Sequence, residues 1–171
     1  MYIVAQIIGF VAVIVYLLSY QMKERKNIII VNTAASILYV IQYTLLGAYE
    51  GAITDVFATV SAISANHKEK PLIKRFAYVI LGAINIAIIT TGIILYKNVY
   101  SLLPVAGTVL QTSALWITKE KQIRIVSVLG TPFWIVYNFY CEAYGPAIGS
   151  IFSMISILVA IYRYDIRKKK Q

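Results

Sequence analysis

The sequence has few charged residues, one cysteine and one histidine, and each scarcity excludes a class of protein. Only 13% of its 171 residues are charged, whereas soluble domains carry about 25%. Cys141 allows no intramolecular disulfide and no thiolate metal cluster, and His67 cannot form a histidine-pair metal site. No nucleophile motif is present either. We therefore expect no metal, no cofactor and no enzymatic activity.

Apolar residues take the place of the missing charge, at 60% of the chain with a mean hydropathy of +0.74. A soluble fold of 19 kDa could not bury that much apolar surface. The apolar residues form continuous runs, such as IIGFVAVIVYLL, and not the alternating pattern of a membrane β-barrel. We therefore expect an all-α membrane protein.

Seven apolar runs are long enough, or nearly so, to cross a bilayer as helices, although the third is short and polar. They are Tyr2–Tyr20, Ile28–Tyr49, Gly51–Ala65, Phe76–Tyr96, Ser101–Thr118, Ile125–Tyr144 and Pro146–Tyr162. If all seven cross, 15 of the 16 basic residues lie on one side, and only Lys97 lies on the other. Basic residues gather in cytoplasmic loops. This predicts a multi-pass membrane protein with its N-terminus outside and its C-terminus in the cytoplasm.

The net charge of +9 therefore follows membrane topology, and we expect no nucleic-acid partner. The basic tail RYDIRKKKQ is either a topology anchor or a site for anionic lipid headgroups. Membrane lipids are the expected surroundings, and the sequence leaves a homo-oligomer open.

An internal repeat relates the two halves of the chain. Shifting the sequence by 95 residues places LYVIQYTLLGAYEGAITDVFATVS on FWIVYNFYCEAYGPAIGSIFSMIS, with Tyr49 on Tyr144 and Phe57 on Phe152. Three helices, one inverter helix and three more give two parallel triple-helix bundles. We expect the first bundle in residues 1–70, the inverter in 71–100, and the second bundle with the basic tail in 101–171. Transporters built from parallel repeats bind solute between the repeats.

Three segments carry a resemblance to known proteins: Ser101–Trp116 (SLLPVAGTVLQTSALW), Gln42–Tyr49 (QYTLLGAY) and Trp134–Tyr140 (WIVYNFY). The chain resembles the SWEET and PQ-loop superfamily, and within it the YgjV-type bacterial inner-membrane proteins. The resemblance implies the three-plus-one-plus-three architecture and alternating-access transport of a small polar solute. A non-transporting receptor or scaffold of the same fold is the alternative.

Asp55 is the single acidic residue in the interior of an apolar run, since Glu142 lies two residues from the end of its run. It either caps its helix and reaches the outer water, or it is a pocket carboxylate. In sugar carriers of the superfamily, the resemblance implies an aromatic residue on the second helix and a polar residue 16 positions later on the third. Trp134 with Ser150, and Tyr39 with Asp55, have that spacing. Those carriers use Asn at the polar position, so this chain favours an asymmetric or cationic solute over a sugar.

Further candidates lie on the same helices. Tyr137 completes the W-x-x-Y pattern of those carriers, and the amides Gln42 and Asn138 lie one helical turn beyond the aromatic residues. Each amide is either a binding group or an interhelical hydrogen bond. Pro104 and Pro132 lie within two spans, where each forms either a hinge or a static kink.

Overall fold

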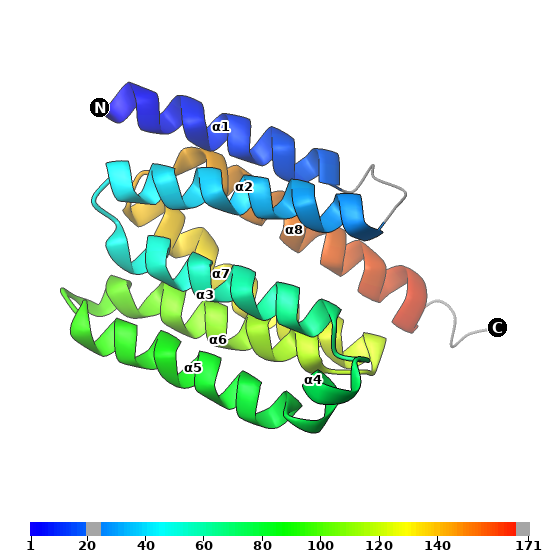
Figure 1. The fold of residues 1–171 in the computed structure, drawn as a ribbon. Helices are drawn as coiled ribbons and strands as arrows, with labels where there is room; N and C mark the ends of the chain where they lie inside the picture. The colour runs from blue at the N-terminus through cyan, green and yellow to red at the C-terminus, as the bar shows by residue number, and fades with distance from the viewer. Residues whose placement is uncertain (20–24, 167–171) are drawn as a thin grey trace.

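The computed structural model describes residues 1–19 and 25–166, and every regular element in these ranges is a helix (Figure 1). The long helices are α1 (Tyr2–Ser19), α2 (Arg25–Leu45), α3 (Tyr49–Asn66), α5 (Ala77–Ile94), α6 (Leu102–Trp116), α7 (Glu120–Tyr140) and α8 (Tyr144–Ala160). The short elements are α4 (Pro71–Arg75), the 3-10 turn η1 (Val99–Ser101) and the π-helical turn η2 (Ile161–Ile166). The all-α prediction is confirmed. Lys23 and most of the basic tail, from Arg167 onward, lie outside the described residues.

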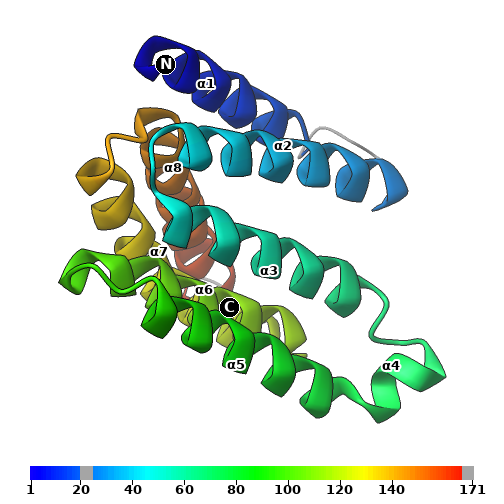
Figure 2. The same ribbon diagram turned by 60° about the vertical axis from the view of Figure 1, so that its left-hand side comes forward.

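Six of the long helices form a closed ring, and α5 lies outside it. Within each half of the chain, α1 packs on α2 and α2 on α3, while α6 packs on α7 and α7 on α8. The halves meet where α3 packs on α6 and where α1 packs on α8. Helix α5 covers α3 and α6 at one edge (Figures 1 and 2). The ring therefore has two interfaces within each half and two between the halves.

The turns that join α2 to α3 and α7 to α8 have the same backbone structure, 95 residues apart. Gly47 and Glu142 both adopt left-handed conformations, with φ of 71° and 57°. The N–H groups of Ala48 and Ala143 each donate to the carbonyl oxygen five residues earlier, at 2.9 and 2.8 Å. This is the Schellman pattern, in which a left-handed residue ends a helix. It ends α2 at Leu45 and α7 at Tyr140, four residues before the ends of the predicted apolar runs.

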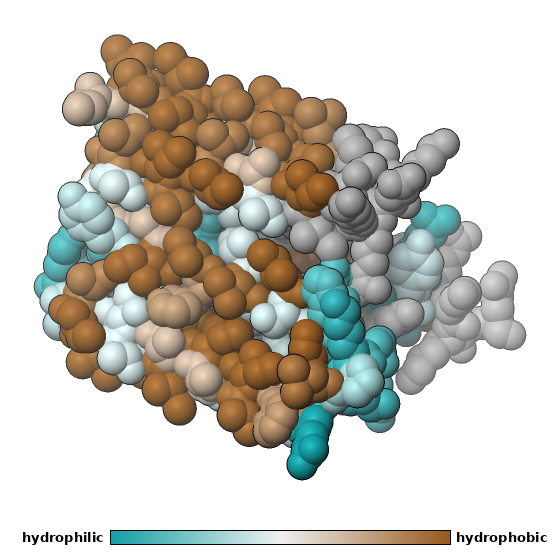
Figure 3. All heavy atoms as spheres, in the orientation of Figure 1, coloured by the Kyte–Doolittle hydropathy of each residue, from teal (hydrophilic) through white to brown (hydrophobic). Residues whose placement is uncertain are grey.

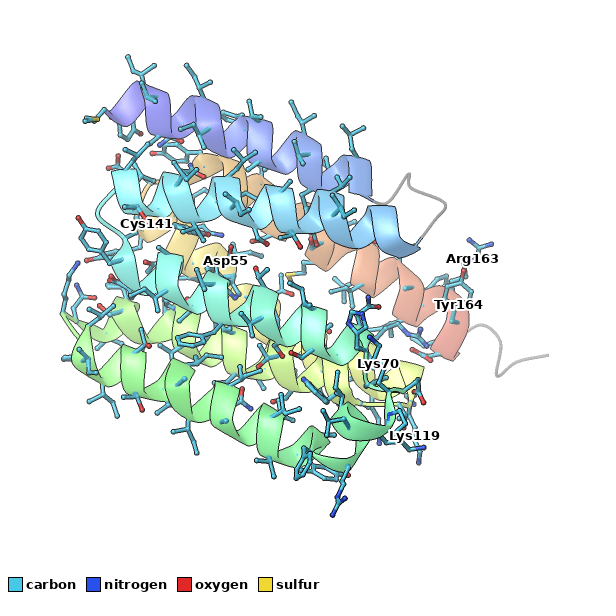
Figure 4. All side chains as sticks on the ribbon, in the orientation of Figure 1. Asp55, Lys70, Lys119, Cys141, Arg163 and Tyr164 are labelled. Carbon is cyan, nitrogen blue, oxygen red and sulfur yellow. The ribbon has the colours of Figure 1, made fainter. Side chains whose placement is uncertain are left out.

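Basic side chains gather at one end of the helix ring, which we call the basic end. Lys68 to Arg75 follow α3, Lys119 and Lys121 lie at the start of α7, and Arg163 follows α8. The Lys68 Nζ donates to the carbonyl oxygen of Ile117 at 3.3 Å, which joins two of these loops. Figure 3 shows the hydrophilic residues at this end, and Figure 4 labels Lys70, Lys119 and Arg163 there. Lys97 lies at the opposite end, 3.6 Å from the Glu50 carboxylate.

Two helices in the described residues are both long and apolar enough to cross a membrane by themselves. They are Ala77–Ile94 and Tyr144–Ile166, with mean hydropathies of 2.1 and 1.8. The segments Tyr2–Leu18 and Thr33–Leu45 are apolar but shorter. On α5, Tyr78 and Ile94 are 92% and 74% exposed. An outward surface of this kind is suited to contact with lipid and not with water.

Candidate functional site

A cavity of about 580 Å³ lies inside the ring of six helices, in the size range of small-molecule sites. All six ring helices contribute to its described wall, and α5 contributes none. Many wall residues carry hydroxyl groups: Thr33, Ser36, Thr59, Thr112, Ser127, Thr131, Ser150, Ser153 and Ser156. The cavity wall therefore carries many hydroxyl groups among apolar ones, whereas the outer surface of the helices that enclose it is mostly apolar (Figure 3).

A layer of buried side chains closes the cavity at the end opposite the basic end. The Tyr43 hydroxyl donates to Asn138 Oδ1 at 2.7 Å, and Asn138 Nδ2 donates to Ser150 Oγ at 3.2 Å. The backbone N–H of Gly51 donates to the Tyr137 hydroxyl at 3.1 Å. The Trp134 ring lies 6.1 Å from the Tyr43 ring, centroid to centroid. These contacts join α2, α3 and α8 to α7, and we call them the closing layer.

From the closing layer the cavity runs toward the basic end. Its wall extends along α3 to Asn66, the last residue of that helix, and along α8 to Ile157. Tyr43 and Asn138, in the closing layer, are 3% and 1% exposed, whereas Ile63 near the end of α3 is 39% exposed. The wall residues of the closing layer are thus more deeply buried than Ile63 near the basic end.

Asp55 supplies the single carboxylate of the described cavity wall, and that wall contains no lysine, arginine or histidine. Asp55 is the seventh residue of α3, so it lies beyond the helix cap. Its Oδ2 atom is buried and has no hydrogen-bond partner among the described residues. Figure 4 shows Asp55 in the interior of the helix ring, toward the end where Cys141 lies. The alternative of a helix-capping role is therefore wrong.

Positions 95 residues apart lie in the cavity wall as pairs. The pairs are Tyr16 and Gln111, Ser36 and Thr131, Tyr39 and Trp134, Tyr43 and Asn138, Asp55 and Ser150, Ala58 and Ser153, and Ala62 and Ile157. One pair, Tyr43 and Asn138, is joined by a direct hydrogen bond. The cavity is therefore lined by corresponding positions from both halves of the chain, and one such pair is in direct contact.

Comparison with known proteins places the chain in a family. The sequence profile of the Imp-YgjV family, described as bacterial inner membrane protein, matches residues 3–168. The chain belongs to this family. It is also 22% identical to the inner membrane protein YgjV of Escherichia coli (strain K12) over 144 residues, which cover 84% of this chain and 75% of that protein. No solved structure matches the chain significantly.

Membership of an inner-membrane family explains the distribution of polar groups. In a bilayer, polar side chains are costly unless they face the protein interior. Five of the seven residues predicted to bind solute lie in the cavity wall: Tyr39, Asp55, Trp134, Asn138 and Ser150. The structure brings them together from α2, α3, α7 and α8.

The other two predicted binding residues, Gln42 and Tyr137, lie behind the wall. The Gln42 side chain is fully buried against Gly9 of α1, and neither of its polar atoms has a hydrogen-bond partner among the described residues. A Cβ atom on Gly51 would lie 2.7 Å from the Tyr137 ring. Both side chains therefore pack between helices. Sequence reasoning missed Tyr43, which follows Tyr39 by four residues as Asn138 follows Trp134.

The two hinge candidates occupy different positions in their helices. Pro104 is the third residue of α6, in the first turn, where an N–H has no partner within the α-helix. Pro132 lies in the interior of α7 and removes one backbone hydrogen bond there. Pro132 is therefore the better placed of the two for bending a helix that lines the cavity.

In the described residues, no group of three or more histidine, cysteine or acidic side chains could hold a metal ion.

The Asn85 amide on α5 lies outside the cavity and forms hydrogen bonds with α6. It accepts from Thr112 at 2.9 Å and donates to Ser113 at 3.3 Å.

Proposed function

We propose that this inner membrane protein is a SWEET-like carrier, which moves a small polar solute by alternating access between two triple-helix bundles. The observation that carries the proposal is a cavity enclosed by helices of both halves, which is lined by hydroxyl groups and by positions 95 residues apart and is bounded at one end by the closing layer. A binding site between parallel repeats is the arrangement that this class of transporter uses.

The proposed architecture assigns α1–α3 to the first bundle, α5 to the inverter and α6–α8 to the second bundle. The matched turns after α2 and α7 support the repeat, because their left-handed residues and hydrogen bonds are 95 residues apart. The absence of α5 from the described cavity wall supports its role as a linker. In this proposal the basic end faces the cytoplasm, as the positive-inside rule favours.

The structure supplies a candidate for one state of the transport cycle, in which the site is reached from the basic end. Opening the other end would break the Tyr43–Asn138 and Gly51–Tyr137 hydrogen bonds, while the bundles close around the basic end. Pro132 lies about one and a half helical turns from Asn138 on α7, so a bend there would move the closing layer.

The two tryptophans allow a direct binding test. Trp134 lies in the cavity wall, whereas Trp116 lies outside it and donates to Ser61 at 3.2 Å. A Trp116→Phe variant would report solute binding through Trp134 fluorescence alone. Sugars, polyols, amino acids and small amines would be screened in this way, and each ligand found would then be tested for counterflow in proteoliposomes.

We expect at least one solute to bind saturably and to show counterflow. Trp134→Ala lacks the fluorescent reporter, so it is tested by counterflow alone, which we expect it to abolish. Trp116→Ala is the matched control and should retain both binding and counterflow. Saturable binding without flux would instead identify a receptor or scaffold of the same fold. If nothing is bound and nothing moves, the carrier proposal is wrong.

A further inference from the structure

We propose that the solute carries a positive charge, as a small organic cation such as a quaternary or primary ammonium compound, and that Asp55 is its counter-ion. This inference rests on the proposed function, because it names the chemical class of solute for the same cavity. Three observations support it: an unbalanced carboxylate, aromatic walls and a neutral opposite side.

The first observation is that the charge of Asp55 is not balanced within the cavity. No lysine, arginine or histidine lies in the described wall, and Asp55 Oδ2 is buried with no hydrogen-bond partner among the residues that the structure describes. A buried carboxylate without a partner is costly, and a bound cation would supply the missing charge. Two described basic residues form ion pairs, and neither pair includes Asp55. Lys97 pairs with Glu50, and Arg124 pairs with Asp165.

The basic end does not cancel this preference. Its lysines lie on exposed loops, for example Lys70 and Lys119. Salt screens charges in water over about 8 Å at physiological ionic strength. Asp55 lies inside the helix ring, where such screening is weaker. A cation bound beside it would therefore interact more strongly with Asp55 than with the exposed lysines.

The second observation is the aromatic wall. Tyr16, Tyr39, Tyr43 and Trp134 all line the cavity. The faces of aromatic rings attract cations, and tryptophan attracts them most strongly. Because Tyr39 and Trp134 are paired positions of the two halves, one ring is available from each half.

The third observation is the difference between Asp55 and its counterpart. Ser150 occupies the position 95 residues later, is neutral, and accepts a hydrogen bond from Asn138 at 3.2 Å. One side of the site therefore offers a carboxyl group and the other side offers hydroxyl and amide groups. That arrangement fits a solute with a cationic group at one end and a neutral polar group at the other.

The test compares probes of equal shape and different charge. Choline and its uncharged isostere 3,3-dimethyl-1-butanol would be titrated into the Trp116→Phe protein, as would ethanolamine and ethylene glycol. We expect saturable changes in Trp134 fluorescence with at least one cation and none with its neutral partner. This comparison uses no change at Asp55, so it stands even if Asp55 variants fail to fold.

Two variants on the same helix complete the test. Asp55→Asn should weaken cation binding by about thirtyfold or more, the effect of removing one member of a buried charge pair. Glu50→Gln is the matched control, because Glu50 is also buried on α3 but lies outside the cavity wall. We expect it to leave the affinity for the cation within about twofold, because Glu50 does not line the cavity.

The outcomes separate this inference from the proposed function. If neutral solutes bind and are carried while the cations are not, or if Asp55→Asn leaves cation affinity unchanged, the inference is wrong and the carrier proposal stands. If neither class of probe binds and no solute of the wider panel moves, both are wrong.

Discussion

Gly47 and Glu142 are the described residues with left-handed backbone, and they occupy the same place in two matching turns. A residue with a side chain loses about 1–2 kcal/mol in this conformation, and glycine loses almost none. We therefore expect Glu142→Gly to raise the free energy of unfolding by about 1 kcal/mol, and Gly47→Ala to lower it by a similar amount. Unfolding of the purified protein in mixed detergent micelles would measure both changes.

Glu142→Ala is the control for that pair, because it removes the carboxylate and keeps the strained backbone. Its stability should stay below that of Glu142→Gly. If the alanine and glycine variants are equally stabilised, the effect belongs to the side chain and the backbone argument fails.

At the same scale, the cavity residues could be predicted only in part, for a geometric reason. On a helix, the positions three and four residues beyond Trp134 lie about 100° apart, since each residue turns the helix by 100°. The sequence shows that both Tyr137 and Asn138 are near the aromatic face, but their neighbours decide which one lines the cavity. In both halves it is the residue four positions on, Tyr43 or Asn138, and the residue three positions on packs against another helix.

At the scale of helices, α1 and α8 approach each other closely enough to exclude a side chain. A Cβ atom on Gly145 would overlap the backbone of Gly9, and would lie 2.9 Å from the Phe10 nitrogen. Backbone cannot move aside as a flexible side chain can, so we expect Gly145→Ala to lower the free energy of unfolding by about 1–3 kcal/mol, as overpacking does. Small residues at such crossings are typical of membrane helices.

Gly82→Ala on α5 is the matched control, since nothing lies within 4 Å of a Cβ atom there. It should be neutral or stabilising by up to about 1 kcal/mol, because alanine favours a helix over glycine. The same unfolding measurement applies to both variants. Equal losses at the two glycines would contradict the close crossing of α1 and α8.

The helices themselves were predictable, including the polar third run, which forms the continuous helix α3. Hydropathy and the placement of charge indicated each segment. They could not show that α3 packs on α6 and α1 on α8, because those contacts join segments far apart in sequence and depend on small residues and local crossings. The closing of the six helices into a ring, and the cavity inside it, required the structure.

For the whole molecule, the separation of charge predicts how the protein lies in the membrane. The described basic residues other than Lys97 belong to the basic end or to the start of α2, which lies beside it. Cytoplasmic loops attract such residues, and an inner-membrane family places the molecule between cytoplasm and exterior. We therefore expect the basic end to face the cytoplasm, so that α1 begins outside.

Single cysteines in a Cys141→Ser background would test this orientation, because Cys141 is the chain's single native thiol. Lys70→Cys places a thiol on an exposed loop at the basic end, and Tyr96→Cys places one at the opposite end, where the native side chain is 53% exposed. A membrane-impermeant maleimide should label Tyr96→Cys in right-side-out vesicles and Lys70→Cys in inside-out vesicles.

The reverse pattern would place the mouth of the cavity outside the cell. Labelling of both thiols from one side would contradict a helix ring that crosses the membrane, since α5 with the short α4 separates the two positions by the length of a span.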